Sequence, residues 1–255
     1  MKVEKKEVNG HVYYRRFGIY RMLEHWILMI TFFTLVLTGL PQRFHEYEIS
    51  KQIIALFGGI VNVRVIHRAT GIAFTILAMQ HIVVACIGML FKRWHASMMV
   101  TVKDFYDTID NIKYYLGMRD IPALCDRYDY RQKFEYWGVV LGGILMIITG
   151  FILWFPTTFT KFLPGQVVPA AKAAHQNEAL LAFLVIVVWH MYNSVFNPEV
   201  FPLDKTIFTG WISRELLLHE HPLELARIEN RSIEEIIEEL RSLHLSHVGE
   251  REVKE

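Results

Sequence analysis

Apolar residues are concentrated in four runs that are separated by polar segments. Each run is close to the ~20 residues that a helix needs to cross a bilayer. None has the short apolar region and small-residue cleavage site of a signal peptide. We therefore predict an all-α integral membrane fold with four transmembrane helices. They cover about residues 20–40, 66–91, 136–155 and 175–196, and Pro41, Pro156 and Pro198 lie just beyond three of them.

The polar segments divide the chain into an N-terminal segment (1–19), a membrane domain (20–197) and a polar tail (198–255). Residues 51–63 are apolar but too short to span, so we predict that they lie at the outer interface. In the tail, Ser232 and Glu235 fit a helix capping box. The apolar stripe that follows is suited to docking on a partner or the membrane, and equally to packing on its own chain. It consists of Ile233, Ile236, Ile237, Leu240 and Leu243.

Lysine and arginine are distributed unequally between the two sides of these helices. Residues 1–24, 92–133 and the tail after 197 together hold 21, whereas residues 42–68 and 157–174 together hold six. Basic residues favour the cytoplasmic side of membrane proteins. Both termini are therefore predicted to be cytoplasmic, in a chain of the cytoplasmic membrane.

The composition excludes several classes of protein. The 255 residues are 53% hydrophobic and 21% charged, with a formal net charge of +1. This balance argues against a nucleic-acid-binding protein and against a disordered chain. The two cysteines exclude a disulfide scaffold, and no CxxCH motif is present for a covalently attached haem.

Five histidines lie in or beside the apolar runs, although ionisable residues are rare there unless they have partners. His67 and His81 are 14 residues apart, and His175 and His190 are 15 apart. These spacings correspond to about 21 and 22 Å along a helix, on similar faces. The second and fourth helices thus each present one imidazole at an outer and one at an inner level. His25, near the inner end of the first helix, is the fifth.

Two b-type haems stacked across the membrane would use four of these five histidines, because facing helices of a bundle can supply axial ligand pairs. A metal-transport site is the main alternative, but it favours histidines clustered with carboxylates at one level. Arg68 and Arg21 are candidates to pair with haem propionates, because arginine binds carboxylates with its planar fork. A positive-inside or interfacial charge explains Arg21 as well.

The chain resembles the membrane cytochrome b (gamma) subunits of respiratory formate dehydrogenases, a group related to those of hydrogenases and thiosulfate reductases. The resemblance covers about residues 15–228. It rests on the order of several short pieces: Glu24-His25-Trp26, Thr38-Gly39, His67 with Gly71, residues 128–133 (YDYRQK) with Trp137, His190-Met191-Tyr192 and His221-Pro222.

The resemblance implies four helices, two b haems and a quinone site near the cytoplasmic haem. By the same match, His25 and His190 hold the inner haem, while His67 and His175 hold the outer haem. The helix-4 pair is one residue wider than in close relatives, which places Gln176 in strict register instead of His175. The extra His81 is an alternative inner ligand, a proton relay or a buried polar group. The quinone residues correspond to Asp129, Gln132 and His190, and Asp129 replaces an asparagine of the family.

The function expected from this resemblance is electron transfer between an extracytoplasmic partner and the quinone pool (menaquinone or ubiquinone). The partner would be an iron–sulfur subunit or a multihaem cytochrome c, accompanied by a catalytic subunit. Alternatives are a quinol-oxidising subunit with the opposite electron flow and a stand-alone b561-like quinone oxidoreductase. A non-redox membrane transporter or anchor is the alternative from another class.

Overall fold

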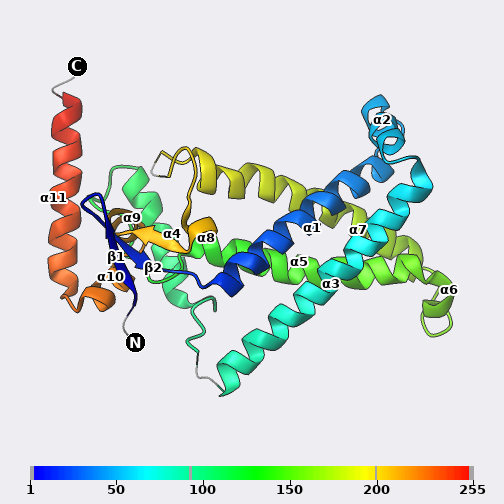
Figure 1. Cartoon of the computed structure of the whole chain (residues 1–255), viewed down its shortest axis with the longest axis horizontal. Helices are drawn as coiled ribbons and strands as arrows, with labels where there is room; N and C mark the ends of the chain where they lie inside the picture. The colour runs from blue at the N-terminus through cyan, green and yellow to red at the C-terminus, as the bar shows by residue number, and fades with distance from the viewer. Residues whose placement is uncertain (1–2, 92–93, 199, 253–255) are drawn as a thin grey trace. The chain divides into compact units, whose positions relative to one another are not determined.

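The structure is a computed structural model that describes residues 3–91, 94–198 and 200–252. The chain divides into two compact units (Figure 1). We call Tyr20–His95 with Trp137–Asp204 the spanning unit. Met1–Ile19, Ala96–Tyr136 and Lys205–Glu255 form the composite unit, which is assembled from three separate stretches of sequence.

The four predicted transmembrane segments are confirmed as long apolar helices. They are α1 (Ile19–Arg43), α3 (Ile60–Phe91), α5 (Tyr130–Trp154), and the continuous run of α7 (Val167–Leu184), η1 (Val185–His190) and η2 (Tyr192–Phe196). The last three helices begin six to eight residues before the predicted spans. The 51–63 segment is divided between α2 (Glu48–Leu56) and the first turn of α3, and α6 (Pro156–Phe159) follows α5.

The surface of these helices is apolar. In each of the four candidate membrane spans, at most 11% of the apolar stretch is buried within the protein. Large hydrophobic side chains such as Ile30, Ile76 and Leu141 point outward, as expected where lipid is the solvent. Small residues permit close packing inside: a Cβ at Gly143 of α5 would come 3.2 Å from the Phe74 ring of α3. The chain is a multi-pass membrane protein.

The composite unit corrects the expectation of a purely helical fold, because it contains a small antiparallel sheet. Strands β1 (Lys5–Val8), β2 (His11–Arg15) and β3 (Trp211–Ser213) pair in that order. Asn9 and Gly10 connect the first two strands, both with positive φ (53° and 80°). This is the tight hairpin turn that an Asn-Gly pair favours, and the turn signal was present in the sequence.

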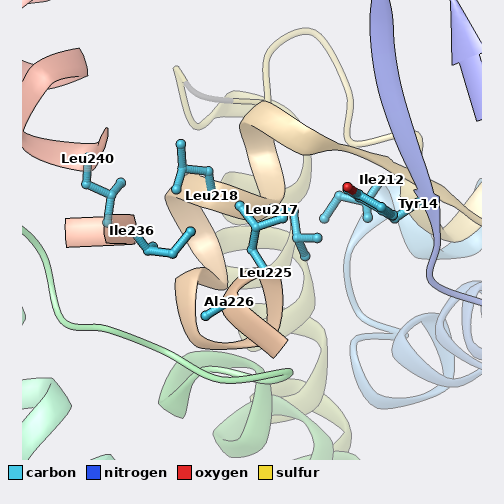
Figure 2. Close-up of a cluster of buried hydrophobic side chains, with 8 residues drawn as sticks. All are labelled: Tyr14, Ile212, Leu217, Leu218, Leu225, Ala226, Ile236 and Leu240. Carbon is cyan, nitrogen blue, oxygen red and sulfur yellow. The ribbon is translucent and has the colours of Figure 1, made fainter. Parts of the chain in front are cut away.

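Helices complete the composite unit around a hydrophobic core (Figure 2). Tyr14 and Ile212 come from the sheet, and Ile236 and Leu240 come from the C-terminal helix. Two residues of the tail stripe are thus buried in the chain's own core, while Ile233 is 47% exposed and the side chain of Leu243 lies outside the described residues. Ser232 accepts a hydrogen bond from the Glu235 backbone N–H, which confirms that end of the capping box. The helices are α4 (Val102–Tyr115), α8 (Thr206–Thr209), α9 (Arg214–Glu220), α10 (Pro222–Glu229) and α11 (Ile233–Glu252).

A buried polar network joins the three segments of the composite unit. Glu224 forms ion pairs with Arg16 and Arg127. Arg16 also donates to Nε2 of His221, which is 1% exposed, at 2.9 Å. The other ring nitrogen, Nδ1, donates to the Asp126 carbonyl at 2.7 Å. His221 is therefore held neutral, and burial together with the guanidinium of Arg16 lowers its pKa well below the usual value.

Candidate functional site

The two histidines predicted for the outer level face each other in the spanning unit. His67 of α3 and His175 of α7 have ring centroids 6.3 Å apart at an interplanar angle of 74°. Each ring contacts a threonine through Nδ1: Thr38 of α1 lies 2.9 Å from His67, and Thr149 of α5 lies 2.9 Å from His175. Four helices therefore contribute to the outer pair, although only two of them carry histidine.

These threonines define which ring nitrogen carries the proton. The Thr38 hydroxyl donates to the Thr34 carbonyl at 2.6 Å, and the Thr149 hydroxyl donates to the Leu145 carbonyl at 2.7 Å. Because a hydroxyl has one proton, each threonine oxygen accepts from histidine Nδ1–H. Nε2 then retains its lone pair. Metal-binding histidines usually have such a partner on the nitrogen that does not ligate.

Glycines follow both threonines and stand against the same rings. A Cβ at Gly39 would lie 3.1 Å from Cε1 of His67, and one at Gly150 would lie 3.4 Å from Cε1 of His175. A Cβ at Gly71, one turn after His67, would meet no atom within 4 Å. The glycines therefore allow close approach to the rings and leave space beside them. This arrangement, with two available Nε2 atoms, fits a planar haem.

The inner level contains a second pair. His25 of α1 and His190 of η1 have ring centroids 6.5 Å apart, at an angle of 41°. His81 of α3 is engaged differently: its Nδ1 lies 2.8 Å from Oε1 of Glu24 and 3.3 Å from the Arg21 guanidinium. The geometry thus pairs His190 with His25, and it gives His81 a carboxylate partner.

The irregular fourth helix accounts for the wide histidine spacing. Residues 185–190 and 192–196 are π-helical, whereas residues 167–184 are α-helical. A π-helix bonds i to i+5 and so contains more residues in each turn. The π-helical turn of 185–190, which lies between the two histidines, accommodates the additional residue. His175 therefore still faces His67, and His190 still faces His25. His175 faces His67, whereas the Gln176 backbone carbonyl accepts from Arg43.

Arg68 and Arg21, the two candidate propionate partners, both have contacts within the protein. Arg68 lies over the Trp154 ring at 5.4 Å. Arg21 donates to Glu24 at 2.6 Å. Neither contact uses all five donors of a guanidinium.

Asp129 and Gln132, the candidate quinone residues, form a capping box at the start of α5. The Asp129 carboxylate accepts from the Gln132 backbone N–H at 2.8 Å, and the Gln132 side chain accepts from the Asp129 N–H at 3.3 Å. Asp129 is 3% exposed and also accepts from Nε of Arg131 at 2.8 Å. Both side chains therefore help to begin α5, and the third residue, His190, is in the inner pair.

The paired arrangement of these histidines differs from a cluster that would hold a bare metal ion. Among the residues that the structure describes, no group of three or more His, Cys, Asp or Glu lies close enough to hold a metal ion. An apolar cavity of about 410 Å³ lies elsewhere in the spanning unit, beside α1 and α2. Its walls include Leu37, Pro41, Ile49 and Phe183, and no residue of the two histidine pairs lines it.

Comparisons with known proteins agree with these features. A family profile described as "Prokaryotic cytochrome b561" matches residues 16–210. The cytochrome b556(Fdn) subunit of nitrate-inducible formate dehydrogenase from Escherichia coli K12 is 25% identical over 215 residues, covering 84% of this chain and 91% of the relative. The b556(fdo) subunit from the same strain is 22% identical over 202 residues, with 78% and 86% covered.

A formate dehydrogenase cytochrome b556 subunit from Haemophilus influenzae is 26% identical over 205 residues, which are 78% of this chain and 77% of that protein. These matches confirm the resemblance seen in the sequence.

Proposed function

Because the chain belongs to the prokaryotic cytochrome b561 family, we propose that it is the dihaem cytochrome b subunit of a respiratory oxidoreductase similar to formate dehydrogenase. It would carry electrons between an extracytoplasmic iron–sulfur subunit and the quinone pool, while a separate catalytic subunit oxidises the substrate. The observation that carries this proposal is the presence of two facing histidine pairs, 6.3 and 6.5 Å between ring centroids, in one helical unit.

In this proposal each residue has a defined task. Haem b, when bound, supplies one-electron chemistry at its iron. His67 and His175 hold the outer haem, and His25 and His190 hold the inner haem. Thr38 and Thr149 orient the outer imidazoles through Nδ1. Arg68 and Arg21 remain proposed propionate partners, because each guanidinium has donors beyond its contact in the protein.

We propose that quinone is reduced near the inner pair, with Asp129, Gln132 and His190 as its contacts. Two electrons and two protons convert one quinone to one quinol, and the protons come from the cytoplasmic side. The capping box lets the roles of Asp129 be separated. Asn caps helices about as well as Asp, so Asp129→Asn should preserve folding. If it also leaves quinone reduction unchanged, the Asp129 carboxylate has no part in that reaction.

The proposed orientation places both termini in the cytoplasm, as the lysine and arginine distribution indicates. The outer pair then lies toward the electron-donating partner. A reporter fused to residue 255 that is active only in the cytoplasm tests this orientation. If this fusion is inactive, and a reporter placed on the opposite side of the membrane is active, the orientation is the reverse of the one proposed.

Haem quantification with a pyridine haemochrome spectrum tests the core of the proposal. We expect two b haems per chain in the wild type. His67→Ala and His175→Ala should each remove the same haem, and His25→Ala and His190→Ala should each remove the other. His81→Ala is the matched control on α3, because His81 bonds to Glu24.

The other outcomes identify the alternatives. Loss of the inner haem in His81→Ala but not in His25→Ala would show that His81 of α3, and not His25, is an axial ligand of that haem. Absence of haem in the wild type would favour a non-redox transporter or anchor. Electron flow from quinol to a multihaem cytochrome c, measured with the purified complex, would reverse the proposed direction. Full activity without any partner would support a stand-alone quinone oxidoreductase.

A further inference from the structure

Helix α4 of the composite unit has an inverted distribution of polar and apolar side chains. Its buried residues are Asp104, Asp107 and Asn111. By contrast, Phe105 and Tyr106 are 64% and 61% exposed. A helix on the surface of a water-soluble domain shows the opposite arrangement. The outward face of α4 is therefore suited to an apolar environment.

The buried polar face is fully committed to contacts, which fixes the rotation of the helix. Asp104 accepts from Lys133 Nζ at 2.7 Å and from the Thr101 backbone N–H at 2.6 Å. Asn111 Oδ1 accepts from the Ala123 N–H at 2.7 Å. Turning the apolar face inward would leave these buried groups without partners, at a large cost in desolvation. The apolar side chains consequently remain on the outside.

Five of the exposed apolar side chains form one continuous stripe. At about 100° per residue they fall within an arc of about 120°, and the exposed Tyr115 lies about 60° outside it. The stripe also contains one exposed lysine, Lys113, whose long stem can carry its charge beyond an apolar layer. Its apolar members are Val102, Phe105, Tyr106, Ile112 and Leu116, all more than half exposed.

The contacts of α4 also place it beside the start of a membrane-spanning helix. Lys133, the partner of Asp104, belongs to the first turn of α5, and α5 continues without interruption to Trp154. On the other side, only ten residues separate the start of α4 from the end of α3 at Phe91. The helix is thus tied at both sides to segments that cross the bilayer.

From these observations we propose that α4 lies in the surface of the phospholipid bilayer, with its apolar stripe at the boundary between headgroups and acyl chains. Aromatic and aliphatic residues on one face, with a lysine to meet lipid phosphate, are typical of interfacial helices. The buried Asp104–Lys133 pair would then hold the beginning of α5 at a defined depth. This inference does not depend on the haem assignment.

Spin-label accessibility in the full chain reconstituted into phosphatidylcholine–phosphatidylglycerol nanodiscs tests the proposal. Cys86→Ala removes the exposed native thiol and serves as the background, because Cys125 is buried. A nitroxide is then attached at Tyr106→Cys, with Phe105→Cys as a second position. Glu234→Cys, on an exposed site of α11, is the control. We expect molecular oxygen to relax the α4 labels several-fold more effectively than a water-soluble nickel complex, with the reverse at position 234.

Two outcomes would overturn the proposal. Equal access of the nickel complex to the labels on α4 and α11 would place α4 in water. Labels on α4 that neither reagent reaches would show that protein covers the stripe. Spin–spin broadening would then identify a second copy of this chain, and its absence a different subunit. Unchanged near-ultraviolet circular dichroism shows that each labelled variant is folded.

Discussion

The hydroxyl of Thr149 lies 2.9 Å from Nδ1 of His175, and Thr38 has the same relationship to His67. In both cases a glycine follows the threonine and stands against the same ring. Two Thr-Gly pairs, from α1 and α5, thus support two histidines from α3 and α7. Each histidine of this pair is therefore supported by the same local arrangement, a threonine followed by a glycine on a neighbouring helix.

Replacing Thr149 or Thr38 with valine should raise the midpoint potential of the proposed outer haem. Loss of the acceptor for Nδ1–H makes the imidazole a weaker donor to ferric iron. A hydrogen bond of about 1 kcal/mol corresponds to a shift on the order of 40 mV for one electron. Redox titration followed at the haem absorbance band measures this shift.

Thr34→Val is the matched control for the threonine variants, since the Thr34 hydroxyl donates to the Ile30 carbonyl of its own helix. Thr149→Ser, which retains the hydroxyl, should restore the wild-type potential. Equal potentials in Thr149→Val, Thr34→Val and the wild type would contradict the positioning role.

Gly39→Ala should reduce occupancy of the proposed outer haem. The added Cβ would come 3.1 Å from Cε1 of His67, so the ring must move away from its present place. Gly138→Ala on α5 is the control, because a Cβ there meets no atom within 4 Å. Haem per chain, measured for both variants, distinguishes them. Equal loss in both would point to a general effect of substituting helical glycines.

Acidification should destabilise the composite unit through His221. Its pKa is lowered in the folded state, so its contribution is complete above about pH 6.5 and is lost as the pH falls below that value. Each unit of pH in that range costs up to about 1.4 kcal/mol of unfolding free energy. Thermal unfolding of the detergent-solubilised protein between pH 5 and 8 measures the effect. His221→Gln should show a flatter profile, and an equally steep one would assign the pH dependence to other groups.

Glu224→Ala should destabilise the composite unit by about 3–5 kcal/mol, because it leaves the buried Arg16 and the partly buried Arg127 with no carboxylate between them. Arg227→Gln is the control, since Arg227 and Asp126 form an exposed ion pair in the same unit. Exposed pairs typically contribute about 0–1 kcal/mol. Chemical denaturation followed by circular dichroism compares the two variants. Similar losses of stability would contradict the importance of burial.

The sequence predicted those features that depend on the length of an apolar run or on the spacing of residues along one helix. Four apolar runs predicted four long helices, because a bilayer requires about 20 apolar residues for each crossing. The 14- and 15-residue histidine spacings predicted rings at two levels, and the structure brings His67 near His175 and His25 near His190. Their roles as haem ligands remain proposals.

Other features could not be read from those patterns. The π-helical turn of 185–190, which lies between His175 and His190, has no sequence signal of its own, so the sequence alone places the wider spacing out of register. The threonine contacts depend on how neighbouring helices pack. The hairpin at Asn9-Gly10 was predictable from its turn residues, but its pairing with β3 joins positions nearly 200 residues apart.

That pairing has a consequence for biosynthesis. Strand β2 ends at Arg15, and its partner β3 begins at Trp211, after all four membrane crossings. At roughly 5–20 residues per second, a ribosome needs about 10–40 s to supply the missing strand. The hairpin of β1 and β2 therefore has one unpaired edge until the membrane-spanning segments have been synthesised. Completion of the composite unit therefore requires that all four membrane-spanning segments have been synthesised.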